Sequence, residues 1–106
     1  VMPTRNARHG LAFTSRGKLS IKQARFVADD RPLDPNCACT VCQQFGRSYL
    51  RHLFVAGEML FATLLSIHNL AFYLQLSRDA RAAILGDRYG DWQRETLGRM
   101  AAGLDA

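Results

Sequence analysis

The stretch CACTVC at residues 37–42 places three cysteines within six residues, and the rest of the 106-residue chain contains none. A disulfide framework uses an even number of cysteines spread along the chain, so three clustered thiols do not fit one. Zinc prefers four tetrahedral nitrogen or sulfur ligands, and thiolates two or three residues apart can bind one ion from a single tight loop. The spacing therefore predicts that Cys37, Cys39 and Cys42 bind zinc.

A redox site is the alternative interpretation of the same loop. Cys39 and Cys42 satisfy the C-x-x-C spacing of redox pairs. A thioredoxin-like site needs a strand-to-helix context, and the third thiol would then be superfluous. The sequence favours metal binding over redox chemistry and leaves both hypotheses open.

The fourth ligand has to come from the three histidines, His9, His52 and His68, because no further cysteine exists. His52 can instead be an ordinary surface or interface histidine, and His68 can be a satisfied core histidine. A ligand far along the chain would close a large loop, which is where a structural zinc gains most, and this favours His68. A closed site of three cysteines and one histidine has no open position for water or substrate, so the zinc is predicted to be structural.

The charge of the chain is unevenly distributed. Its net value is +5, and the first 31 residues hold seven basic and two acidic side chains, whereas the remainder holds seven of each. A basic segment of this kind favours a polyanionic partner, with nucleic acid ahead of a membrane, and a solvated surface face is the alternative. The sequence shows no signal-peptide pattern and no uninterrupted apolar run of about 20 residues, so we expect a reducing, cytoplasmic location.

The first third of the chain predicts a small antiparallel sheet. Residues 1–10 form a turn-rich entry, followed by three short extended candidates at 11–14, 19–22 and 25–28. The loop SRG at residues 15–17 separates the first two, and its glycine can supply a positive φ. The stretch DDRPLDPNC at residues 29–37 carries two prolines and three aspartates, which predicts an irregular connection to the cysteine loop.

Helical periodicity begins after the cysteines. Tyr49, Leu50, Leu53 and Phe54 recur at spacings of one helix face, and Gly57 is expected to interrupt that helix. Residues 58–85 contain no proline or glycine and predict a helix about 42 Å long. This is longer than so small a domain needs for itself, so we expect the helix to lie against something larger. A short helix over residues 92–100 should follow.

Several segments together resemble a known family. VMPTRNARHG, RPLDPNCACTVC, RSYLRHL, EML and SIHNLAFY occur in the order and spacing of the C-terminal part of bacterial tRNA-guanine transglycosylase, also called queuine tRNA-ribosyltransferase. The resemblance runs from Val1 to about Tyr89. The spacing C-x-C-x₂-C-x₂₅-H combined with PTRNAR is far more specific than either motif alone.

The resemblance implies a fold and a ligand set. The family's zinc ligands match Cys37, Cys39, Cys42 and His68, which implies one structural Zn²⁺ per chain. The implied fold class is α/β: the C-terminal part of a TIM-barrel enzyme that carries a zinc-binding subdomain, with a small antiparallel sheet, helices and a long C-terminal helix. The implied division is the end of the last barrel strand with the anticodon-recognition loop (1–10), the zinc-binding subdomain (11–57), a long helix carrying the fourth ligand and packing on the barrel (58–86), and a C-terminal helix or tail (87–106).

The resemblance also implies a function. The family's enzymes are pentosyltransferases that exchange the wobble guanine of target tRNAs for a 7-deazaguanine precursor of queuine. The implied partners are the tRNA anticodon loop and the deazaguanine base, and the residues implied to recognise the wobble position are Thr4, Arg5, Asn6, Ala7 and Arg8. Arginine suits this task because its planar guanidinium can pair with phosphate or base edges and stack on a loop base.

A homodimer interface is implied on the helix after the zinc loop. The matching residues are Phe45, Tyr49 and His52, whose spacing puts them on one helix face. Inward packing of Phe45 and Tyr49 is the alternative, because aromatic stripes at helical spacing often belong to a core.

The catalytic aspartate of the family falls in a DCV triplet whose valine matches Val1, so the nucleophile is expected upstream of this chain. The chain alone is therefore expected to be inactive. Its only clustered acids, Asp29, Asp30 and Asp34, are interpreted as turn-capping, solvated side chains. Two further hypotheses remain open: a free-standing zinc-stabilised RNA-binding module, and a structural interaction domain that uses the long helix.

Overall fold

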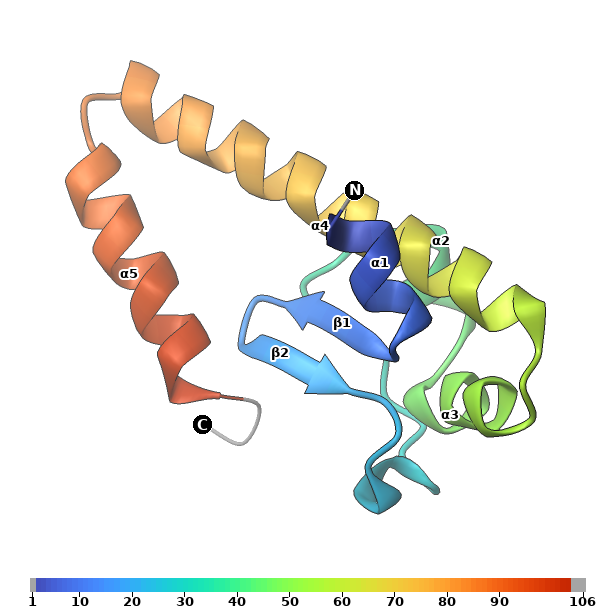
Figure 1. Cartoon of the computed structure of the whole chain (residues 1–106). Helices are drawn as coiled ribbons and strands as arrows, with labels where there is room; N and C mark the ends of the chain where they lie inside the picture. The colour runs from blue at the N-terminus through green and yellow to red at the C-terminus, as the bar shows by residue number, and fades with distance from the viewer. Residues whose placement is uncertain (1, 104–106) are drawn as a thin grey trace.

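The computed structural model describes residues 2–103, with side chains from residue 5 onward. Figure 1 shows one long helix, α4, that crosses the molecule, with the smaller elements gathered along its N-terminal half and α5 folding back from its far end. The order of elements is α1 (Met2–Arg8), β1 (Leu11–Thr14), β2 (Gly17–Ser20), the 3₁₀ turn η1 (Ala24–Phe26), α2 (Thr40–Gln44), α3 (Arg47–Val55), α4 (Met59–Leu85) and α5 (Tyr89–Ala102). The molecule measures 47 × 27 × 22 Å. Because 27 helical residues rise about 40 Å, α4 sets its longest dimension.

The predicted hairpin is confirmed, with a shifted second strand. β1 and β2 pair antiparallel, and Ala12 lies opposite Leu19 with both side chains fully buried. The loop contains two residues, and the Thr14 hydroxyl stabilises it by donating to the Gly17 carbonyl (2.6 Å) and accepting from the Arg16 N–H (3.1 Å). Gly17 has the positive φ that the sequence predicted, +107°. The second strand was expected at 19–22 and instead covers Gly17–Ser20.

The prediction of a third strand at 25–28 is wrong. Residues 24–26 form the 3₁₀ turn η1, and the sheet described here has two strands. Phe26 is 1% exposed, with the guanidinium groups of Arg25 and Arg47 lying 4.9 and 5.5 Å from its ring centroid. Packing of this one aromatic ring overrides the strand preference of the local residues, which is weak in so short a segment.

The N-terminal segment also differs from its prediction. Residues 2–8 are helical, where the sequence predicted a turn-rich entry and the resemblance implied a strand end and a loop. Pro3 is compatible with a helix because it lies in the first turn, where the backbone N–H has no partner in the helix. Ala7 is fully buried and α1 packs against α4, so tertiary contact stabilises a helix too short to form alone.

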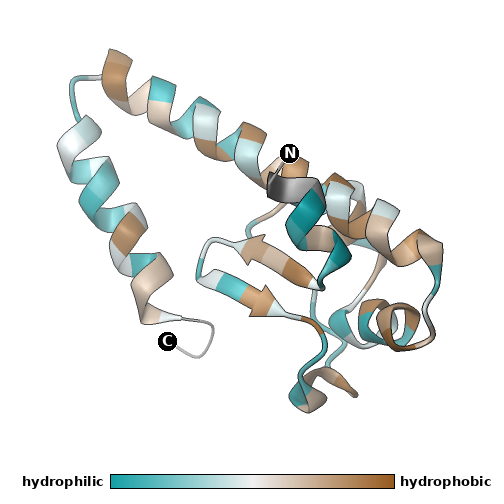
Figure 2. Cartoon of the chain, in the orientation of Figure 1, coloured by the Kyte–Doolittle hydropathy of each residue, from teal (hydrophilic) through white to brown (hydrophobic). Residues whose placement is uncertain are grey.

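The three predicted helices after the cysteine loop are confirmed, and α5 is longer than expected, Tyr89–Ala102. The inner face of α4 packs on α1, α2, α3 and β1, and it buries Phe61 and Leu65 in the main core. Figure 2 shows hydrophobic positions interspersed with hydrophilic ones along the length of α4, whereas α5 is largely hydrophilic. The exposed large apolar residues of α4 are Met59, Leu60, Ile67, Leu70, Leu74, Ile84 and Leu85.

By length and composition, α4 could cross a membrane, with a mean hydropathy of 1.4 in its most apolar window, of which 22% is buried. The lack of an uninterrupted apolar run in the sequence therefore does not by itself exclude a membrane-spanning helix. The stronger observation is that the middle of α4 carries two fully buried polar side chains, His68 and Asn69, both bound to β1. α4 therefore packs on β1 through buried polar side chains, an arrangement that is also found for core helices of globular domains.

Candidate metal centre

The cysteine loop is shaped by hydrogen bonds on both sides of Cys37. The Cys37 N–H donates to the Asp34 carbonyl (3.0 Å), which turns the chain into the loop. Cys39 is the N-cap of α2, and its sulfur accepts from the Cys42 N–H (3.4 Å). Cys39 and Cys42 therefore stand at the two ends of the first helical turn. The sequence missed α2 because five residues are too few to show a helical period.

The long helix supplies the fourth donor. Nδ1 of His68 lies 3.3 Å from the Cys42 sulfur and 3.5 Å from the Cys39 sulfur. The four donor atoms of Cys37, Cys39, Cys42 and His68 lie within 4.8 Å of one another. Around a tetrahedral zinc with bonds of about 2.0 to 2.3 Å, neighbouring donors are roughly 3.5 to 3.8 Å apart. The four side chains therefore fit one zinc ion, and the predicted ligand set is confirmed as a cluster.

The other ring nitrogen of His68 fixes its tautomer. Nε2 lies 2.8 Å from the Phe13 carbonyl oxygen, which can only accept, so Nε2 carries the proton and donates. Nδ1 then presents its lone pair toward the sulfurs of Cys39 and Cys42, as a metal-binding histidine requires. Burial lowers the pKa of His68, against the opposing effect of this hydrogen bond. The imidazole is therefore neutral near pH 7 and able to bind a metal.

The buried environment of Cys42, one of the two cysteines of the C-x-x-C pair, argues against the redox alternative. Burial raises the pKa of Cys42 and of Cys37, opposed by backbone hydrogen bonds from Asp34 and Cys39 respectively. A redox cysteine needs a lowered pKa because the thiolate is the nucleophile. A metal ion supplies the positive charge that would stabilise these buried thiolates, so the environment suits metal binding. All three cysteines are free of disulfides.

The two remaining histidines do not join the cluster. His9 follows α1 and His52 lies on α3, and both side chains are exposed. Neither belongs to the group of potential ligands that the described residues bring together. The choice of His68 over these two is thereby confirmed.

The aspartates of the connector are structural, as expected, but not all of them are solvated. Asp34 is 2% exposed, and its carboxylate accepts from Ser15 N–H (2.8 Å), Ser15 Oγ (3.0 Å) and Asn36 N–H (3.0 Å). It therefore ties the hairpin loop to the start of the cysteine loop. The prediction of turn-capping is confirmed, and the prediction of solvent exposure is wrong for Asp34 because the hairpin covers it.

Arg47 anchors the other end of the connector and is 5% exposed. Its guanidinium donates to the carbonyls of Pro32 (3.1 Å) and Leu33 (3.2 Å) and to the Asp29 carboxylate (3.0 Å). Hydrogen bonds from Arg31, joined by those from Arg47, hold the pKa of Asp29 well below its usual range. The connector thus meets α3 through a buried ion pair whose partners are well satisfied.

Backbone hydrogen bonds also join the connector to the first turn of α3. The N–H groups of Arg47 and Ser48 donate to the carbonyls of Arg31 (2.9 Å) and Asp29 (2.7 Å), so the connector caps helix donors that have no partner within the helix. Gly46 permits the approach, because a Cβ there would lie 2.6 Å from the Asp30 carbonyl oxygen.

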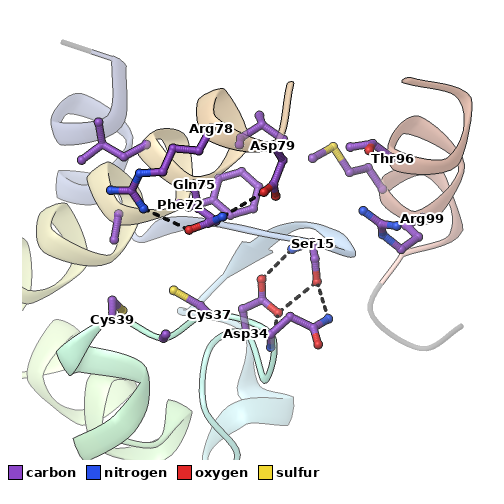
Figure 3. Close-up of a pocket in the computed structure, with 16 residues that line it drawn as sticks. Ser15, Asp34, Cys37, Cys39, Phe72, Gln75, Arg78, Asp79, Thr96 and Arg99 are labelled. Carbon is purple, nitrogen blue, oxygen red and sulfur yellow. Dashed lines mark hydrogen bonds between the residues drawn. The ribbon is translucent and has the colours of Figure 1, made fainter. Parts of the chain in front are cut away.

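A groove of about 620 Å³ borders the metal centre between α4, α5, the hairpin loop and the cysteine loop. Figure 3 shows Ser15 and Asp34 on one wall, Phe72 with the hydrogen-bonded Gln75, Arg78 and Asp79 on α4, and Thr96 with Arg99 on α5. Cys37 and Cys39 are half-buried and also line this groove, so the cysteine side of the centre is less enclosed than His68.

A sequence model of the family described as queuine tRNA-ribosyltransferase matches residues 1–102. This chain belongs to the queuine tRNA-ribosyltransferase family. Relatives of the same name include those of Nitratidesulfovibrio vulgaris, 54% identical over 94 residues, and Sorangium cellulosum, 54% identical over 104 residues. A Helicobacter pylori relative is 50% identical over 97 residues. These matches cover 89%, 97% and 92% of this chain but 25%, 26% and 26% of the relatives, so the chain spans about a quarter of their length.

The residues that the family resemblance assigned to wobble recognition lie on α1. Arg5 and Arg8 are exposed, Asn6 is half-buried and Ala7 is fully buried. The side chain of Thr4 lies outside the described residues. Ala7 therefore faces the core, and Arg5 and Arg8 are the charged side chains that this segment presents to solvent.

The residues that the resemblance assigned to a family dimer lie on and just before α3. Phe45 and Tyr49 stack with ring centroids 5.2 Å apart. Phe45 is partly buried against the core, whereas Tyr49 is 42% exposed and His52 is exposed. The inward-packing alternative therefore holds in part for Phe45, and Tyr49 and His52 remain available at the surface.

Sequence reasoning missed two residues that shape the centre, Arg47 and Asn69. Asn69 is fully buried beside His68 and bonds the backbone of β1. A signal existed for Asn69, since a polar pair in the middle of an apolar helix stands out. Arg47 offered none, because an arginine at a helix start is usually solvated.

Proposed function

We propose that this chain supplies the zinc-bound part of an enzyme that exchanges the wobble guanine of target tRNAs for a 7-deazaguanine precursor of queuine. The observation that carries this proposal is the family match over residues 1–102, which includes the four clustered zinc ligands and the segment at residues 4–8. The proposed compartment is the cytoplasm, where reducing conditions keep the thiols available for metal.

The zinc has a structural task in this proposal. Four protein ligands leave no open coordination position, so the ion would neither activate water nor bind a substrate. It would join the cysteine loop to His68 of α4, which lies 26 residues beyond the last cysteine in the chain. Its contribution is to hold the hairpin, the loop and the long helix in one arrangement.

The exchange chemistry is proposed for the whole protein, in which this chain would adjoin a TIM barrel. A carboxylate outside this chain would form a bond to ribose C1′ as the bond from C1′ to guanine breaks, and the deazaguanine would then displace the carboxylate. The exposed apolar residues Leu60, Ile67, Leu70 and Leu74 of α4 support such an arrangement, since they would suit packing against a larger body.

We assign tRNA contact to the segment at residues 4–8. Arg5 and Arg8 are three residues apart on α1 and therefore share a helix face, and both are exposed. The first 31 residues carry all of the chain's excess positive charge, which favours approach of the phosphate backbone.

The zinc-loaded chain and an RNA hairpin with guanine at the wobble position provide the first test. Arg5→Ala and Arg8→Ala should each weaken binding and lower the salt dependence by about one unit for each phosphate that is no longer neutralised. Arg81→Ala, which removes an exposed arginine from α4, is the matched control and should bind like the parent. If all three variants bind the hairpin equally well, the assignment of residues 4–8 is wrong. Incorporation of radiolabelled guanine into tRNA by the complete enzyme tests the exchange reaction.

We also propose that Phe45, Tyr49 and His52 contribute to a homodimer. The exposed, stacked ring of Tyr49 suits an interface, where aromatic residues with polar tips are enriched. In the complete enzyme, Tyr49→Ala should raise the monomer fraction seen by light scattering. Tyr89→Ala is a matched control, because Tyr89 is 40% exposed and lies 5.6 Å from the Trp92 ring. A dimer that both variants leave unchanged would contradict the assignment.

A further inference from the structure

The edge of β1 that does not pair with β2 is bound by two side chains of α4. Asn69 Oδ1 accepts from the Phe13 N–H (3.0 Å), and Asn69 Nδ2 donates to the Leu11 carbonyl (3.0 Å). His68 Nε2 donates to the Phe13 carbonyl (2.8 Å). Two adjacent helix residues thus satisfy backbone groups that a third strand would otherwise have to pair.

The orientation of the Asn69 carboxamide follows from its partners. The Phe13 N–H can only donate and the Leu11 carbonyl can only accept, so one arrangement of oxygen and nitrogen fits both. Asn69 and His68 are both fully buried. The Phe13 ring continues the contact toward the next turn of α4, with centroids 6.5 Å from Phe72 and 5.3 Å from Tyr73.

A short, tightly bonded connection joins β1 to α1, the helix that precedes it. α1 ends shortly before β1 begins, and the N–H groups of His9 and Gly10 donate to the Asn6 and Ala7 carbonyls (3.1 and 3.0 Å), which makes the connection tight. The position of β1 along α4 therefore helps to set where α1 lies, together with the direct packing of α1 on α4.

We propose that Asn69 is a positioning residue for RNA binding, because it holds β1 on α4 and so helps to fix α1 with Arg5 and Arg8. The inference rests on the RNA contact proposed above. His68 would be held by the three cysteines through the metal, whereas Asn69 makes its contacts to β1 outside the ligand set. Loss of Asn69 should therefore loosen β1 and leave the zinc bound.

Two variants of the zinc-loaded chain test this role. Asn69→Asp keeps the acceptor for Phe13 but places an oxygen against the Leu11 carbonyl, and Asn69→Ser removes the carboxamide without adding charge. Gln93→Glu adds the same charge at an exposed position of α5 and is the control. The measurements are zinc per chain, the absorption of the cobalt-substituted centre, amide exchange at Phe13, and affinity for the RNA hairpin.

We expect both Asn69 variants to keep one zinc per chain and an unchanged cobalt spectrum. Exchange at Phe13 should accelerate at least about tenfold in Asn69→Ser, which removes the acceptor, and RNA affinity should fall about tenfold in both variants, the effect of losing roughly one net hydrogen bond. RNA affinity equal to that of the parent despite faster exchange would overturn the inference while leaving the proposed function intact. Loss of zinc or of helical circular dichroism in both variants would also overturn it, because Asn69 would then serve the metal or the fold. If the parent does not bind the hairpin, both proposals fail.

Discussion

Replacing Arg47 with lysine tests whether the buried guanidinium fixes the connector that leads to the cysteines. Arg47 donates to the carbonyls of Pro32 and Leu33 and to the Asp29 carboxylate, and its side chain is 6% exposed. Lysine keeps the charge for Asp29, but an ammonium group does not reproduce the planar fork that reaches all three acceptors.

The expected loss follows from the two carbonyls left without their donor. A buried hydrogen bond contributes about 1 kcal/mol net, so Arg47→Lys should lower the free energy of unfolding by about 2 kcal/mol. In a domain of this size, that corresponds to a drop in Tm of roughly 10 °C. The ion pair with Asp29 should survive, which keeps the loss below the roughly 3 to 5 kcal/mol expected for breaking a buried pair.

The assay is urea unfolding followed by circular dichroism, with zinc in excess and zinc content measured for each protein. Arg51→Lys is the matched control, since Arg51 lies on the same helix and donates from Nε to a single carbonyl, that of Gln23, at an exposed site (3.1 Å). This control should change the free energy of unfolding by less than about 0.5 kcal/mol. Equal stabilities for the two variants would refute the reasoning, because burial and the number of acceptors would then not matter.

Three further outcomes are expected. Metal analysis should find one zinc per chain, and Cys39→Ser should lower zinc content and unravel the loop, because site and fold form together; full zinc content in this variant would contradict the ligand set. His68→Ala should lose zinc, whereas His52→Ala, at an exposed site outside the cluster, should retain it. Leu65→Ala should cost about 2 to 5 kcal/mol in a thermal unfolding experiment, because Leu65 is fully buried, whereas Leu74→Ala at 58% exposure should cost less than about 0.5 kcal/mol; similar values would mean that the buried face of α4 is wrongly assigned.

Local signals in the sequence were sufficient for the hairpin and for the helices α3, α4 and α5. Each has a pattern that is read within a few residues: a turn with Gly17, an apolar period, or an uninterrupted stretch such as 58–85. The cysteine spacing predicted a metal, but spacing alone left three histidines open. The geometry decides for His68, whose imidazole is the one that reaches the sulfurs.

The features that could not be predicted depend on partners far away in the chain. Asn69 bonds residues 56 and 58 positions earlier, and Arg47 bonds a carboxylate 18 positions earlier. The sequence of α1 resembles a loop because the helix is stabilised by contact with α4 and not by local pattern. The segment of η1 was predicted to be a strand because phenylalanine favours strands, and its sequence does not show that Phe26 packs in the core. A local pattern carries no information about which distant group will satisfy a polar side chain.

The path of residues 27–39, which contain no helix or strand, is set by anchors on three different elements. Asp29 is bound by Arg47 of α3, Asp34 is bound by Ser15 of the hairpin loop, and the cysteines meet His68 of α4. An irregular segment lacks the regular hydrogen bonds of a helix or strand, so its conformation is restricted only by contacts with other elements. Each anchor therefore reduces the number of conformations that the segment can adopt. The first two anchors are made by protein groups alone, and they hold the segment that leads to Cys37 against α3 and the hairpin loop. With these anchors made, zinc would have only the stretch from Cys37 to Cys42 left to fix against His68, which lowers the entropic cost of joining a short loop to a histidine 26 residues beyond it.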